Sequence, residues 1–341
     1  MRWLLLFLNL LILPHTAQSA EWAATAAPEA HTPGPPTLPD DWTSTSGIYA
    51  RVHSPRSALR AQVRLSSHAE VAIPEIARFL GVAASSRIEV VLTDTVEQFR
   101  TLQPSPPPAW ADATAWPSLS WIFLRTNDLR GGTAKDEKQV FDHEITHVLL
   151  GQAFGQRRVP RWLQEGVSQW TAKEYTPETT RQIASGLLGK GLHTLEDLHQ
   201  GFPADPISAR LAYAQSADFI AWIVAEHGED SVRDLINALS RGVSLERAVK
   251  ESTGKPLRAI DREWRSRLED SWLWLQPLTV DQVWMLIGAI ALVIGFFGVR
   301  RRNRKKLAIW QQQEFLQDSM YTLLMSETDE ETDTSSSEWV H

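Results

Sequence analysis

The sequence predicts an α+β fold with a small sheet in an N-terminal lobe, a helical C-terminal lobe and one C-terminal transmembrane helix. Two β-rich runs, 87–92 and 120–124, lie in the first half of the globular part. Segments with helical periodicity, separated by glycines, fill the second half. An uncharged apolar run follows at 283–299, and its length of about 17 residues is near the lower limit for crossing a bilayer.

The N-terminal region predicts an exported chain. Residues 1–20 combine a basic start, an apolar run and small residues before a cleavage site, which is typical of a signal peptide. An uncleaved N-terminal anchor is the alternative. Residues 21–45 are rich in Pro, Ala and Thr and predict an extended linker. The globular domain is expected at 46–275.

The first half of this domain contains short elements. We expect a strand at 48–52, a strand or a helix at 58–65, a helix at 69–80 and a short helix at 95–102. In the second half, helices are expected at 138–153, 161–173, 177–187, 208–227, 230–240, 244–251 and 256–275.

Composition excludes several classes of function. The net charge of −7 gives no electrostatic footprint for nucleic acid, so no nucleic-acid partner is expected. Because the chain has no cysteine, it can form neither disulfides nor a thiolate metal site. Any metal ion must therefore be bound by His, Asp or Glu.

The C-terminal segment predicts the topology. The transmembrane helix is expected at 278–299, and a cluster of Arg and Lys follows it immediately. Such clusters stay in the cytoplasm, so we expect a single-pass protein of the cell membrane whose globular domain lies outside the cytoplasm. The tail, 300–341, is basic and then acidic. It either recruits a cytoplasmic partner or is solvated without one.

One motif indicates a chemistry. His143 and His147 stand four residues apart, so both project from one helix face and can bind one Zn²⁺. Glu144 lies beside them, placed to take a proton from water. Glu165, on a second predicted helix, can supply a third ligand and leave the fourth position open. The alternative is that these are ordinary residues of a helix surface.

These residues resemble a known family. HEITH, followed after seventeen residues by Glu165 within PRWLQEGVSQW, is similar to the gluzincin metallopeptidases, and in particular to bacterial peptidase MA-like domains. The stretch Tyr213-Ala214-Gln215-Ser216 resembles the "Tyr-x-Gln-Ser" helix of that family. The resemblance implies a zincin-like fold, one zinc ion per chain and a peptide or protein substrate. It also implies that strand 120–124 is the sheet edge above the cleft, where an extended peptide could add, and the alternative is a plain core strand.

The resemblance also suggests further roles. Tyr213 is the candidate donor to a developing oxyanion, although it could equally be a core residue. Many gluzincins carry an acidic residue four positions after the third ligand, where this chain has Gln169. Asp142 is the nearest acidic alternative in the sequence, but it points away from the ligand face.

Three functions remain open at this point. The first is a membrane-anchored zinc peptidase, and the lack of the Gly-x-Met-Glu-Asn motif of aminopeptidases favours endopeptidase action. The second is an inactive peptidase-like module that binds or scaffolds other proteins. The third is a hydrolase of non-peptide amides, such as cell-wall crosslinks.

Overall fold

The computed structural model describes most of the globular domain and a short C-terminal segment. The described residues are 34–109, 111–131, 136–189, 191–270, 284–285 and 287–304. The chain divides into two compact units, Met1–Pro277 and Leu278–His341. The expected signal peptide lies outside the described residues, as do 21–33 of the expected linker, 278–283 of the expected transmembrane helix and 305–341 of the tail.

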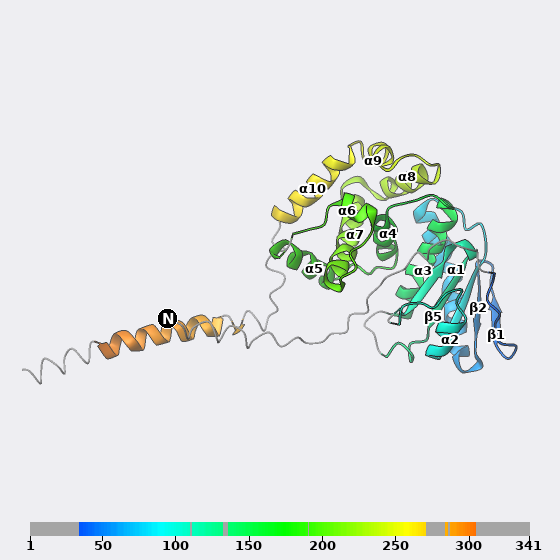
Figure 1. Ribbon diagram of the computed structural model, residues 1–341, viewed down its shortest axis with the longest axis horizontal. Coiled ribbons are helices and arrows are strands. Elements are labelled where there is room, and N and C mark those ends of the chain that lie inside the picture. The colour runs from blue at the N-terminus through cyan, green and yellow to red at the C-terminus, as the bar shows by residue number, and fades with distance from the viewer. Residues whose placement is uncertain are drawn as a thin grey trace, which may run out of the picture. The chain divides into compact units, whose positions relative to one another are not determined.

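A mixed five-stranded sheet forms the N-terminal part of the first unit (Figure 1). Its order is β1-β2-β3-β5-β4, and β2, β3 and β5 are parallel while the two outer strands run antiparallel to their neighbours. The strands are β1 (Thr43–Ser46), β2 (Ala50–Ser54), β3 (Ile88–Thr93), β4 (Ala113–Trp116) and β5 (Trp121–Arg125). The strands predicted at 48–52, 87–92 and 120–124 correspond to β2, β3 and β5.

The sheet is covered on both faces because its central strands are apolar on both sides. Val90 and Ile122 face the main core, where α1 (Leu59–Leu80) and α3 (Glu137–Phe154) pack. Val91 and Phe123 point to the other face and form a smaller core with Phe99 of α2 (Val96–Thr101). Continuous apolar runs are typical of parallel strands buried on both faces.

The expected position of strand 120–124 at the sheet edge is wrong. This strand is β5, and it lies between β3 and β4, so both of its sides are already hydrogen-bonded. The strand at this edge of the sheet is β4, which was not predicted from the sequence. β4 has four residues, of which only Ala113 is buried, so it lacks the alternating pattern that identifies a strand.

Two further expectations change in this lobe. The ambiguous segment 58–65 is helical and continuous with the predicted helix 69–80, so α1 spans 22 residues and includes Pro74. The expected linker also ends before residue 45. Leu38 and Trp42 pack against the smaller core, and β1 begins at Thr43 and pairs with β2.

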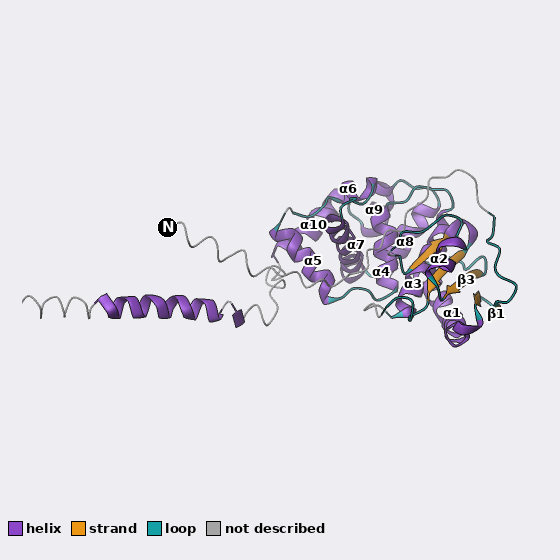
Figure 2. Ribbon diagram, turned by 60° about the horizontal axis from the view of Figure 1, so that its bottom comes forward, coloured by secondary structure: helices purple, strands orange, loops and turns teal. Residues whose placement is uncertain are grey.

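Helices form the rest of the first unit (Figure 2). They are α4 (Arg161–Thr171), α5 (Pro177–Leu188), α6 (Leu195–Gln200), α7 (Pro206–His227), α8 (Glu229–Ser240), α9 (Leu245–Thr253) and α10 (Leu257–Asp270). In the second unit, residues 287–304 are helical. Within the part of the chain that the structure describes, no helix combines the length and apolar character needed to cross a membrane.

Candidate metal centre

The two candidate histidines lie on the buried helix α3. Asp136 begins this helix in a capping box with Gln139, so the chain starts to wind seven residues before His143. His143 is 2% exposed and His147 is 7% exposed. A site built from them lies in a medium of low dielectric constant, where charged groups interact strongly.

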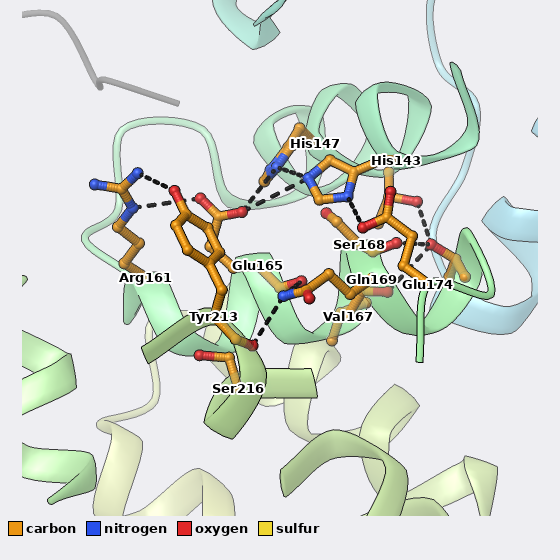
Figure 3. A network of polar contacts seen from close by, with 12 residues as sticks. His143, His147, Arg161, Glu165, Val167, Ser168, Gln169, Glu174, Tyr213 and Ser216 are labelled. Atoms are coloured by element: carbon orange, nitrogen blue, oxygen red, sulfur yellow. Dashed lines mark hydrogen bonds and ion pairs between the residues drawn. The ribbon is translucent and has the colours of Figure 1, made fainter. Parts of the chain in front are cut away.

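Helix α4 carries Glu165 to the same place. Its N-cap is Pro160, and it packs against both α3 and α7. The hydroxyls of Thr146 on α3 and Thr171 on α4 lie 2.6 Å apart and join the two helices. As a result, the third candidate ligand comes from a different helix but faces the histidine pair (Figure 3).

Three potential ligand atoms converge at this site. His143 Nε2 and His147 Nε2 are 3.1 Å apart, and Glu165 Oε2 lies 3.6 Å from the first and 3.5 Å from the second. Tetrahedral zinc with ligands at about 2.0–2.1 Å requires its ligand atoms to be about 3.3 Å apart. Two imidazoles and one carboxylate at these separations therefore fit a zinc ion, and a fourth position is left for water or substrate.

Glu174 completes the surroundings of His143. Its Oε2 lies 3.4 Å from His143 Nδ1, the nitrogen that points away from the other ligands. Burial disfavours the protonated imidazole, but Glu174 and Glu165 outweigh this effect and raise the pKa of His143 to about 10. A negative field that favours a proton this strongly also favours a metal cation at the same place.

Glu174 is an acidic neighbour of His143 at a position other than 169, where the family pattern places one. The side-chain amide of Gln169 donates to the backbone carbonyls of Glu165 and Tyr213. Asp142 does point away from the ligand face, as its position on the helix predicted, and lies 2.7 Å from His68 of α1. No sequence pattern indicates Glu174, which lies nine residues after Glu165 and beyond the end of α4.

Glu144 is buried beside the candidate ligands. It is 3% exposed, and its Oε2 has no hydrogen-bond partner, an arrangement that is costly unless a further group binds there. Burial raises the pKa of Glu144 above its usual value, although His143 and His147 act in the opposite direction. A carboxyl with a raised pKa is suited to taking up and releasing a proton near neutral pH.

Tyr213 lies close to the third candidate ligand. Its hydroxyl accepts a hydrogen bond of 2.9 Å from Arg161, whose Nε lies 3.3 Å from Glu165 Oε1 (Figure 3). Burial and the negative charge of Glu165 raise the pKa of Tyr213 well above its usual value, so the phenol keeps its proton at neutral pH. The structure thus brings all five predicted site residues together.

A family model matches the part of the chain that contains this site. The model described as "Peptidase MA superfamily" matches residues 68–270, which include α3, α4 and Tyr213. This chain belongs to the peptidase MA superfamily. Within this superfamily it is a member of the gluzincin clan. No protein in the curated collection matches.

Solved structures show only a distant likeness. Native yeast LTA4 hydrolase is 11% identical to this chain, with a TM-score of 0.39. The match covers 66% of this chain and 38% of the yeast enzyme. Yeast LTA4 hydrolase in complex with bestatin is 13% identical, with a TM-score of 0.33. That match covers 70% of this chain and 39% of the yeast enzyme. The chain thus spans less than half the length of these enzymes.

Proposed function

We propose that this protein is a membrane-anchored zinc metallopeptidase that hydrolyses peptide bonds outside the cytoplasm. The observation that carries the proposal is the convergence of His143, His147 and Glu165 within a buried site that also holds Glu144. The ligand atoms of the first three all lie within 4.8 Å of one another. Zinc is the metal whose usual number and type of ligands this set matches best.

His143, His147 and Glu165 would hold the zinc ion. When bound, zinc supplies Lewis acidity, which makes water nucleophilic at neutral pH and polarises a carbonyl. Glu144 accepts the proton of the attacking water and delivers it to the leaving amine. Tyr213 donates a hydrogen bond to the carbonyl oxygen as negative charge develops on it.

The proposed location depends on the two ends of the chain. The apolar run at 283–299 supports a membrane anchor, and the basic residues after it support a cytoplasmic C-terminus. The signal-like segment at 1–20 supports export of the globular domain. We also propose endopeptidase action, because the chain lacks the aminopeptidase motif Gly-x-Met-Glu-Asn.

The test compares Glu144→Gln with the wild-type chain. The full chain is purified in a mild detergent, its zinc content is measured by elemental analysis, and its turnover is followed on a mixture of quenched fluorescent peptides. We expect Glu144→Gln to keep its zinc and to lower kcat by about 10²–10⁴-fold, because a general base contributes about that much. A His143→Ala, His147→Ala variant should lose both zinc and turnover.

Glu178→Gln is the matched control. Glu178 lies exposed on α5 and pairs with Arg181, so its substitution should change neither zinc content nor turnover. If Glu144→Gln cleaved as fast as wild type, the assignment of the general base would be wrong. A wild-type chain with zinc and no turnover would favour the inactive binding module, and cleavage of crosslinked cell wall alone would favour the amide hydrolase.

A further inference from the structure

Arg161 contacts two of the predicted site residues, Glu165 and Tyr213. Its Nε lies 3.3 Å from Glu165 Oε1, and its second amino group donates a hydrogen bond of 2.9 Å to the hydroxyl of Tyr213. Its guanidinium carbon also lies 5.0 Å from the ring centroid of Phe202. Each of these three neighbours comes from a different segment of the chain.

We propose that Arg161 is a positioning residue, which holds Glu165 in one-oxygen coordination and leaves the proton of Tyr213 free for the substrate. This inference rests on the proposed function and adds a residue to its machinery.

The two carboxylate oxygens of Glu165 face different neighbours. Oε2 faces both histidine Nε2 atoms, whereas Oε1 faces Arg161. Because Arg161 holds Oε1 towards itself, Oε2 is the oxygen that faces the candidate metal position. Without Arg161, the carboxylate could bind through both oxygens and fill the position that a catalytic zinc site keeps open.

The second part follows from the direction of the hydrogen bond to Tyr213. A guanidinium has donors only, so the oxygen of Tyr213 accepts and its proton remains available. Within the described residues, no acceptor for that proton is found. Tyr175 shows the opposite arrangement, because its hydroxyl donates to the carboxylate of Asp218 at 2.7 Å and its proton is already used.

The position of Arg161 in its own helix supports a functional role. It is the first residue of α4, where the helix dipole disfavours a cation. Its side chain is 28% exposed, so it could have extended into solvent, yet it lies against Glu165 and Tyr213. Residues that break a local rule in this way are often found at functional sites.

The experiment compares Arg161→Met, Arg161→Lys and Arg247→Gln in the full chain. Arg247 is the matched control, because it also pairs through Nε with a glutamate four residues later, Glu251, but on the exposed surface of α9. We expect Arg161→Met to retain one zinc per chain and to lower kcat about 10–100-fold, the range found when groups supporting metal ligands are removed. KM should change little, since a positioning residue does not bind the substrate directly.

Cobalt substitution provides a readout that does not depend on turnover. The visible absorption of Co²⁺ reports its coordination number, so we expect the spectrum of Arg161→Met to differ from those of wild type and Arg247→Gln.

Arg161→Lys should not restore kcat, because an ammonium group is a point charge and cannot hold both neighbours in a planar fork. Arg161→Met should also cost less in a Tyr213→Phe background, since part of its effect acts through that hydroxyl.

Three outcomes would overturn the proposal. The first is an Arg161→Met variant with wild-type kcat and Co²⁺ spectrum. The second is full activity of Arg161→Lys, which would mean that charge alone is sufficient. The third is an increase in KM confined to acidic peptides, which would make Arg161 a substrate-binding residue. A wild-type chain that binds zinc and cleaves peptides would leave the proposed function intact in all three cases, whereas a wild type without zinc or cleavage would refute both.

Discussion

Glu174 adds to the site a charged neighbour of His143 that is not part of the HEITH motif. A metal-binding imidazole is held in one orientation and made more basic when its other nitrogen faces a carboxylate. Glu174 is 8% exposed and lies 3.4 Å from His143 Nδ1, so it can do both. His143 is therefore supported by a charged residue and not by the neutral amide of Gln169.

Replacing Glu174 by Gln should weaken zinc binding. The amide keeps the shape of the side chain but removes the negative charge that faces His143. We expect the affinity for zinc to fall about 10–100-fold, as is usual when such a supporting group is lost. Competition with a chromophoric chelator measures this. An affinity equal to that of the exposed control Glu178→Gln would show that Glu174 does not support the metal.

At the scale of the helices, the site depends on how closely α4 approaches α7. Gly166 follows Glu165 directly and lies in this contact. A Cβ atom built at Gly166 would be 2.3 Å from the backbone oxygen of Ser216 and 2.7 Å from Cγ1 of Ile220. Since the oxygen belongs to the backbone of α7, it cannot move aside without moving that helix.

Gly166→Ala should therefore destabilise the domain and displace Glu165. Overpacking of this kind costs about 1–3 kcal/mol, and the rigid neighbour places the expected cost at the upper end of that range. The urea midpoint of unfolding and the zinc affinity should both fall. Gly34→Ala is the control, because among the described residues no atom other than those of its chain neighbours lies within 4 Å of its Cβ position. Equal midpoints for the two variants would contradict the close approach of α4 and α7.

The elements that carry the motif could be predicted from the sequence, because local signals mark them. The helix predicted at 138–153 is α3 at 137–154, and the one predicted at 161–173 is α4 at 161–171. β4 could not be predicted in the same way. It becomes a strand only by pairing with β5, a contact that short-range periodicity does not reveal.

Glu174 could not be predicted because it depends on how α4 ends. Position 169, four residues after Glu165, lies inside α4, whereas Glu174 would need a helix of three more residues to remain on it. Instead, Lys173 adopts a left-handed conformation with φ of 56°, and the amide of Glu174 donates to the carbonyl of Gln169 at 2.9 Å. This Schellman-type turn directs Glu174 back towards His143. Lysine occupies the position where glycine usually marks such a turn, so the sequence carries no signal of it.

At the scale of the whole first unit, Asp218 connects α10 to the segment that carries Glu174, beside the candidate metal centre. It is 2% exposed and accepts hydrogen bonds of 2.7 Å from Tyr175 and from the indole of Trp264 in α10, and it also pairs with Arg267. Tyr175 follows Glu174 directly in the chain. Burial and the neighbouring charge of Asp218 raise the pKa of Tyr175 to about 12, so its hydroxyl remains a donor at neutral pH.

Asp218→Asn should therefore loosen both the C-terminal packing and the support of His143. The amide removes the charge and presents a donor where donors already point, and losing hydrogen bonds to a buried charged group costs about 1.5–3 kcal/mol each. The pair with Arg267 adds less, because that side chain is 39% exposed and its charge is screened by solvent. We expect a clear fall in the urea midpoint of the full chain and a smaller fall in zinc affinity.

Asp230→Asn is the control. The side chain of Asp230 pairs with Arg233 but is 81% exposed, so this substitution should change neither the midpoint nor the zinc affinity. If Asp218→Asn lowered the midpoint but left the zinc affinity unchanged, Asp218 would stabilise the fold without holding the Glu174 segment in place.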